Sequence, residues 1–250
     1  MSEAFTSRIL KGGALLDDVR RLVEVWDPNQ SPPNNFDRVL AGNLLGKRSQ
    51  VRLREVLELV LKPRFIDPGP EVMASLGVLR QIPNAFRDAC YYETARVDPL
   101  IARFAEEMLY TRHLEGRTVI SVSEVEGWLG TLSGPTDWSP SVTIRVAQGL
   151  LAALRDFGIL EGSVRKRLVS PRPTISGFAY SAYREYQAGS SARGLLTNSV
   201  WHLWLLEEAQ VRDLFSAAEA HGVLSYAQAG SAVRIDWRVG SLEDVARAAA

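Results

Sequence analysis

The stretch SPSVTIRVAQGLLAALRDFGILEGSVRKRLV, residues 139–169, decides the fold. Ser139-Pro140 is typical of a helix start, because serine caps free N–H groups and proline fits the first turn. Apolar residues then recur every three or four positions up to Phe157-Gly158, where the glycine supplies the left-handed residue that ends many helices. A turn at Gly162 follows, so the stretch predicts a helix that runs into a short β-hairpin.

The residues before this stretch predict the other elements of the same unit. Asp98-Pro99 begins a helix to about Tyr110, and the β-branched run Thr118–Val122 predicts a strand. Ser123 and Glu126 have the spacing of a capping box, which opens a helix to Leu129. After a Gly/Pro/Ser turn, Gly130–Trp138, comes the helix already described. Helix, strand, helix, turn, helix, hairpin is the element order of a winged helix-turn-helix.

The C-terminal part repeats the last step of this order. Helices are predicted over Ile175–Gln187, Trp201–Leu206 and Glu207–His221, and a hairpin over Val223–Trp237. His221-Gly222-Val223-Leu224 matches Phe157-Gly158-Ile159-Leu160 in pattern. Two interpretations are open: a second copy of the module, or the common device of a glycine-capped helix leading into a strand.

The N-terminal part is predicted to be a helical bundle. A loop is expected over residues 29–35, and Pro63 is expected to end a helix. Helices are expected over Lys11–Val25, Phe36–Leu45, Gln50–Leu61, Pro70–Arg80 and Asn84–Val97. The predicted fold class is therefore mainly α: a helical N-terminal domain (1–97), a winged helix-turn-helix-like domain (98–173), and a C-terminal helical domain that ends in a β-hairpin (174–250).

Composition narrows the class of protein. The 250 residues contain 29 Lys plus Arg and 29 Asp plus Glu, so bulk positive charge does not drive any nucleic-acid binding. The single cysteine, Cys90, fits a reducing compartment. No apolar stretch approaches the roughly 20 residues that cross a bilayer. The start, Met1–Phe5, lacks the features of a signal peptide. We expect a cytoplasmic protein with no membrane partner.

No motif for catalysis stands out. Gly42–Arg48 resembles a phosphate-binding loop, but it has three residues between its glycines and no Ser or Thr after Lys47. The three histidines are isolated, and there is no nucleophile elbow. Adjacent acidic pairs such as Glu106-Glu107 point in different directions on a helix and are interpreted as solvated. We expect no catalytic residue, no metal and no cofactor.

Two basic regions are the candidate binding sites. The helix from Ser139 buries the stripe of Val142 and presents Ser141, Arg145 and Gln148 on the opposite face, with Ala152 and Arg155 beyond them. Arginine and glutamine read guanine and adenine edges in the major groove. The hairpin offers Arg165, Lys166 and Arg167 at its tip or second strand, where a wing meets phosphates. An ordinary charged surface or a protein-binding module is the alternative.

The second region lies in the N-terminal half and is a candidate for contact with a nucleic-acid backbone. Its members are Lys47, Arg48, Arg52, Arg54, Lys62 and Arg64, opposed locally by Glu55 and Glu58. An ion-paired surface would have the same composition. The C-terminal part is acidic on balance, which makes its hairpin a better candidate for a protein interface than for phosphate binding.

Several segments, in this order, resemble the BrxA family of bacteriophage-exclusion (BREX) loci. They are Leu10–Leu16, Asn43–Ser49, Lys62–Phe65 and Gly149–Gly158, and the resemblance extends to the Gly222 hairpin. It implies a helical protein with a winged helix that binds DNA beside a methyltransferase, an ATPase and other defence proteins. It implies no catalytic residues. Some relatives are described as inner-membrane proteins, with which this sequence disagrees, and the N-terminal part of the family is likened to RNA-binding antitermination factors.

The sequence thus predicts a non-enzymatic accessory protein of a BREX-type system that binds double-stranded DNA. Arg145 and Gln148 would face the groove, the hairpin arginines and Lys166 would contact phosphates, and Lys47, Arg48 and Arg52 would be a second backbone contact. The alternatives are a scaffold for other BREX proteins and an RNA-binding antitermination-like factor, with RNA the less favoured nucleic acid.

Overall fold

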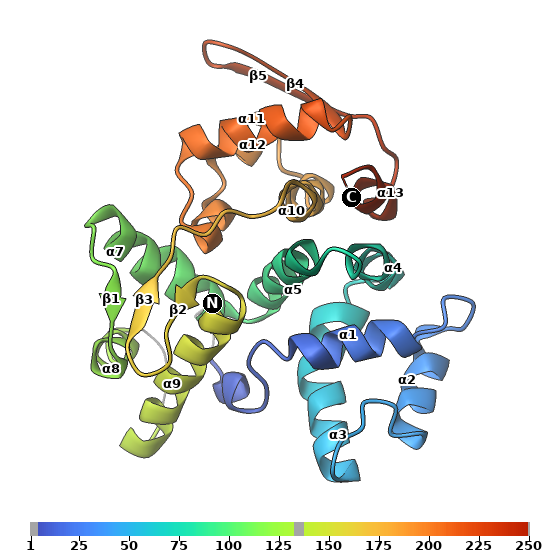
Figure 1. Ribbon diagram of the computed structural model, residues 1–250, viewed down its shortest axis with the longest axis vertical. Coiled ribbons are helices and arrows are strands. Elements are labelled where there is room, and N and C mark those ends of the chain that lie inside the picture. Colours follow the sequence, from blue (N-terminus) through green and yellow to red (C-terminus); the bar gives the residue numbers. More distant parts are fainter. Residues whose placement is uncertain (1–4, 133–137, 250) are drawn as a thin grey trace.

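The computed structural model describes residues 5–132 and 138–249, and most of them lie in helices. Figure 1 shows three groups of elements around a central helix, α5 (Pro83–Val97). The N-terminal helices lie on one side of it. The segment around α9 (Pro140–Asp156) lies on another, and the C-terminal helices lie above α5 with a projecting hairpin. The predicted mainly helical class with short antiparallel sheets is confirmed.

The N-terminal helices begin and end partly where the sequence predicts. They are η1 (Ser7–Leu10), α1 (Leu16–Val25), α2 (Pro32–Ala41), α3 (Gln50–Val56), the π-helix η2 (Leu57–Ile66), α4 (Pro70–Leu79) and α5.

The predicted loop over residues 29–35 is wrong in its second half, because α2 already begins at Pro32. Pro32 and Pro33 occupy the first two helical positions, where a missing N–H costs nothing. The Ser31 hydroxyl accepts a hydrogen bond from the Asn34 N–H at 3.3 Å and caps the helix.

Pro63 does not end its helix, as the sequence had predicted. It lies inside η2, the wider π-helix that continues α3. The Asp67 N–H bonds the Lys62 carbonyl at 2.9 Å, five residues back. The spacing of a π-helix shifts the pattern of donors and acceptors, so the chain passes a residue that has no N–H without ending the helix.

The middle segment carries a three-stranded sheet. Its elements are α6 (Pro99–Arg103), the π-helix η3 (Phe104–Leu109), α7 (Tyr110–Leu114), β1 (Val119–Ile120), α8 (Val122–Leu129), α9, β2 (Leu160–Glu161) and β3 (Lys166–Leu168). The sheet order is β1-β3-β2, antiparallel throughout, so the strand before α8 pairs with the second strand of the hairpin.

The predictions for the two ends of α8 have different outcomes. The capping box is formed by Ser121 and Glu124, two residues before the predicted pair, because Ser121 is the last extended residue. The predicted turn Gly130–Trp138 falls partly on residues 133–137, which lie outside the described residues.

The C-terminal segment consists of α10 (Ile175–Gln187), α11 (Ala192–Thr197), η4 (Ser199–Trp204), α12 (Glu208–Ala220), β4 (Leu224–Ala229), β5 (Ala232–Trp237) and α13 (Leu242–Ala248). Helices α11 and α13 were not predicted. Trp201 and Trp204 are buried, as expected for core residues.

One continuous core joins the three predicted domains. Tyr91 of α5 stacks on Phe157 at the end of α9, with ring centroids 4.8 Å apart, and meets Trp204 of η4 edge-on at 5.6 Å. Its hydroxyl donates to the Leu203 carbonyl at 3.1 Å. Buried aromatic contacts of this kind fix the segments relative to one another. None of the described helices has the length and apolar character to cross a membrane.

Candidate nucleic-acid interface

Helix α9 presents the predicted polar face to solvent. Val146, Leu150 and Leu154 are buried, and Ser141, Arg145 and Gln148 are exposed on the opposite side. The period of 3.6 residues explains the separation of the two stripes. The helix stands at the edge of the molecule (Figure 1).

The arginines of α9 differ in how their charge is used. Arg155 bonds Asp156 at 2.6 Å, so its charge is largely neutralised. Arg145 has no ion pair with any described residue, and its Nε donates to the Ser141 carbonyl at 3.3 Å. No acidic residue occurs between Pro140 and Arg155. Arg145 is therefore the cation of this face that is available to a partner.

The β2–β3 loop turns sharply at Gly162. Its φ is +88°, a left-handed conformation that favours glycine, and a Cβ there would lie 2.2 Å from the Arg165 carbonyl oxygen. Val164 and Arg165 project from the loop, and Arg165 has no ion pair within the described residues.

Lys166 is not exposed for the phosphate contact that the sequence predicts. Its side chain is buried, and its ammonium donates to the carbonyls of Gly162 and Ser163 at 2.7 and 2.6 Å. Burial lowers the pKa of Lys166, and the positive charge of Arg155 acts in the same direction. The structure thus gives Lys166 a role in closing the loop.

Arg167 is exposed but does not lie at the tip. It is the middle residue of the central strand β3 and pairs in register with Val119 on one side and Glu161 on the other. Because neighbours in register share a face of the sheet, the Arg167 side chain lies between those two residues on the outer face.

The N-terminal basic cluster is mostly ion-paired. Lys47 bonds Asp18, and Arg52 lies 3.5 Å from Glu55. Lys62 bonds Asp67 at 2.6 Å. Arg54 reaches Glu58 at 3.9 Å, which is a weak contact at the surface. Within the described chain, Arg48 alone of this cluster is exposed without an ion pair.

Arg64 does not belong to a surface. It is buried, and its guanidinium donates to the carbonyls of Gly13 and Gly12 at 2.7 and 3.3 Å, with Asp98 3.7 Å away. Burial lowers its pKa to about 10. Arg64 therefore fastens the Gly12–Gly13 segment to the core and is removed from the predicted nucleic-acid contact.

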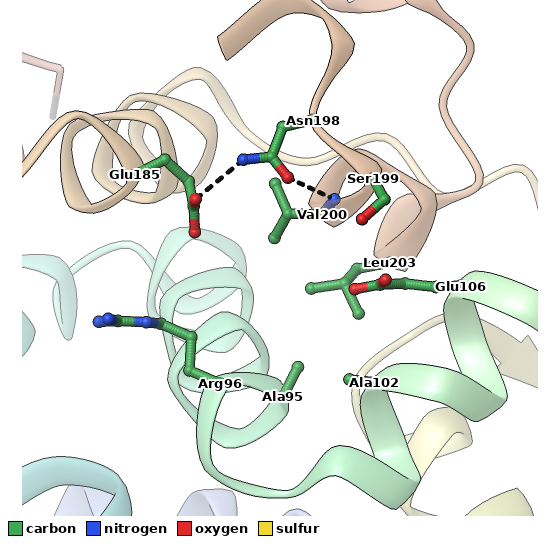
Figure 2. A pocket seen from close by; sticks show the side chains of 9 residues that line it. All are labelled: Ala95, Arg96, Ala102, Glu106, Glu185, Asn198, Ser199, Val200 and Leu203. Carbon is green, nitrogen blue, oxygen red and sulfur yellow. Dashed lines mark hydrogen bonds between the residues drawn. The ribbon is translucent and has the colours of Figure 1, made fainter. Parts of the chain in front are cut away.

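A cavity of about 230 Å³ with a mixed polar and apolar lining lies where α5, η3 and η4 meet (Figure 2). Glu106 reaches into it from η3 and is partly buried, so its interpretation as a solvated residue is wrong. Burial raises the pKa of Glu106 to about 7. Glu185, at the opposite wall, accepts from the Tyr92 hydroxyl at 2.6 Å and the Asn198 amide at 2.9 Å.

This cavity has the features of a junction between segments. Both oxygens of Glu185 are already bonded to the protein. In the described chain, no group of three or more His, Cys, Asp or Glu side chains is placed to hold a metal ion. Helical period identifies the exposed residues of α9, whereas the cavity depends on contacts between distant segments and has no sequence signal.

Comparison with known proteins identifies a family for this chain. No curated protein matches the chain significantly. The model of the BrxA family matches residues 3–182, which include the N-terminal helices, the three-stranded sheet and the first part of α10. The chain therefore belongs to the BrxA family, and this membership associates it with the BREX phage-defence systems.

Proposed function

We propose that residues 98–173 form a winged helix-turn-helix that binds double-stranded DNA, with α9 in the major groove. The order helix, strand, helix, helix, hairpin and the sheet order β1-β3-β2 support this proposal. In such a unit the second helix of the pair enters the groove and the hairpin flanks it. Here α9 occupies that position and the β2–β3 hairpin is the wing.

The exposed polar side chains of α9 are the main support for the proposal. Arg145 is a cation without an ion pair among the described residues, and Gln148 follows it by one turn on the same face. Arginine pairs with guanine O6 and N7, and glutamine pairs with adenine N6 and N7. Small Ser141 lets the N-terminal turn approach the bases closely. The absence of acidic residues between Pro140 and Arg155 leaves the face open to a polyanion.

Within the BREX system the protein is proposed to be a non-enzymatic, cytoplasmic accessory factor that needs no cofactor. Arg48 is the part of the N-terminal cluster that still supports a second backbone contact. Lys47 and Arg52 support it less, because each already has an acidic partner. The same ion pairing weakens the alternative of an RNA-binding factor that acts through this cluster.

Fluorescence anisotropy of the full chain with duplex DNA and matched RNA, over a salt series, tests the proposal. Duplex DNA is expected to bind more tightly than RNA, and the logarithm of affinity is expected to fall linearly with the logarithm of salt. Arg145→Ala should weaken binding by about 1–3 kcal/mol. Arg234→Ala, the loss of an exposed arginine on the second hairpin, is the matched control and should bind like the wild type. No duplex binding near physiological salt would overturn the proposal.

A protein scaffold is the second candidate, and one observation favours it. Helix α12 exposes Asp213, and Glu207 and Glu208 precede or begin it, so this surface suits a basic protein partner better than DNA. Co-elution with individual BREX proteins after nuclease treatment, lost in an Asp213→Arg variant but kept in Arg145→Ala, would establish this role.

A further inference from the structure

The tip of the β2–β3 loop is fixed from within. The Lys166 ammonium bonds two successive carbonyls, those of Gly162 and Ser163, at 2.7 and 2.6 Å. Gly162 adopts a conformation that no other residue fits there, because a Cβ would lie 2.2 Å from the Arg165 carbonyl oxygen. A buried ammonium is costly unless it is fully hydrogen-bonded, so the loop uses that charge to hold one shape.

The β2–β3 loop exposes an apolar side chain to solvent. Val164 is 93% exposed, more than any other large apolar residue described. Arg165 follows it, exposed and without an ion pair in the described chain. Single exposed apolar residues are common on surfaces; this one stands next to the exposed Arg165, at a turn that is held by the two Lys166 hydrogen bonds. Such a tip suits a partner surface that combines apolar walls with strong negative potential.

We infer that Val164 and Arg165 enter the minor groove of the duplex and favour A·T-rich sequence there. This inference rests on the proposed function, since it concerns the DNA that α9 would engage. The minor groove of A·T tracts is narrow and strongly negative, which attracts an arginine, and proteins that bind the minor groove frequently insert an apolar side chain between base steps. A phosphate contact would also use Arg165 but would leave Val164 in water.

Arg167 provides a matched control. It has the same charge and lies two residues further along the hairpin. Its side chain, however, shares the outer face of the sheet with Val119 and Glu161, away from the tip. If the hairpin acts only through bulk charge, Arg165→Ala and Arg167→Ala will behave alike. If the tip reads the groove, only Arg165→Ala will remove base preference.

The experiment compares duplexes that differ only in the minor groove. A duplex with G·C flanks and the same duplex with inosine·C flanks present identical major grooves, but inosine lacks the minor-groove amino group of guanine. Wild-type protein should bind the inosine duplex about five- to tenfold more tightly, within the range of one base-pair discrimination. Arg165→Ala should reduce this preference to less than about twofold, while Arg167→Ala keeps it.

Val164→Ser gives an independent readout. It should weaken binding to the inosine duplex about three- to tenfold without changing the salt slope, because an apolar contact releases no counterion. Netropsin, a minor-groove ligand, should compete with the wild type on A·T flanks and should compete less with Arg165→Ala.

The outcomes separate this inference from the proposed function. Equal affinity for the two duplexes, or equal loss of preference in both arginine variants, would overturn the minor-groove inference while Arg145→Ala still weakened binding. Absence of duplex binding by the wild type near physiological salt would overturn both.

Discussion

Two regions of this molecule end a helix in the same way and then differ in almost everything that a partner would meet. Helix α9 ends at Gly158 (φ +80°) and α12 at Gly222 (φ +77°). The Ile159 N–H bonds the Leu154 carbonyl at 2.9 Å, and the Val223 N–H bonds the Ala218 carbonyl at 3.2 Å. These are the same helix-ending bonds, and each leads into a hairpin.

The surfaces of the two regions have opposite character. Residues 140–156 contain two arginines and one aspartate, whereas residues 208–220 contain one arginine against two glutamates and one aspartate. The second hairpin has two six-residue strands, and the first has strands of two and three residues. The match to the BrxA family covers the first region and ends at residue 182, before the second. The same helix-ending conformation thus precedes two surfaces of different charge. For this reason different partners are proposed for the two surfaces.

The largest difference in stability is expected where the two helices end. Phe157 is buried against Tyr91, whereas His221, which holds the same position in the second region, is exposed. Phe157→Ala should lower the free energy of unfolding by about 3–5 kcal/mol because it leaves a cavity. His221→Ala should change it by less than about 0.5 kcal/mol. Urea unfolding followed by tryptophan fluorescence measures both. Similar losses would show that the second helix end also packs into the core.

Charge reversal should separate the two regions in DNA binding. Arg145→Glu with Arg165→Glu should weaken duplex binding roughly 100-fold, at about 1–3 kcal/mol for each arginine. Arg234→Glu with Arg238→Glu applies the same change of charge to the second hairpin and should have little effect. Anisotropy at one salt concentration measures both. Equal losses would mean that binding follows net charge and has no defined site.

The capping glycines give a smaller contrast. Both adopt a left-handed conformation, so alanine at either position should cost about 1–2 kcal/mol of unfolding free energy. A Cβ on Gly158 would also lie 2.9 Å from the Arg87 guanidinium, whereas the space around Gly222 is open. Gly158→Ala should therefore destabilise the protein more than Gly222→Ala in the same urea experiment. The reverse order would contradict the packing described at α9.

The junction between the two regions should respond to pH. Glu106 of η3 faces η4, and its pKa is raised from 4.5 to about 7 by burial. The folded protein then holds a proton that the unfolded chain releases, so this residue's contribution to stability falls as pH rises from about 4.5 to 7. Glu106→Gln should be more stable than the wild type at pH 8, with the difference shrinking or reversing at pH 4. A constant difference across this range would mean that Glu106 is solvated in the folded protein.

Local signals predicted those elements whose ends are set by neighbouring residues. Ser139-Pro140 and Gly158 bound α9 within one residue of the predicted ends, and helical period identified Arg145 and Gln148 as exposed. Local sequence patterns failed where a contact with a distant residue or a less common helix geometry determines the structure. The π-helix carries the chain past Pro63, and Asp18 neutralises Lys47 from 29 positions earlier in the sequence.

The same limit applies to the candidate site. Arg165, Lys166 and Arg167 form one basic run in the sequence, but the structure separates them. Arg165 lies at the loop tip, Lys166 is buried and bonds the loop carbonyls, and Arg167 lies on the outer face of the sheet. Strand alternation alone would have placed Lys166 opposite its two neighbours. Its bonds to the loop carbonyls depend on how the turn closes, which residue type does not specify.

Hydrogen–deuterium exchange of the full chain, with and without saturating duplex DNA, tests the central claim most directly. The account predicts protection over residues 139–149 and 162–167, with exchange over residues 207–237 unchanged. Protection confined to α12 and the second hairpin, or spread evenly over the surface, would contradict it.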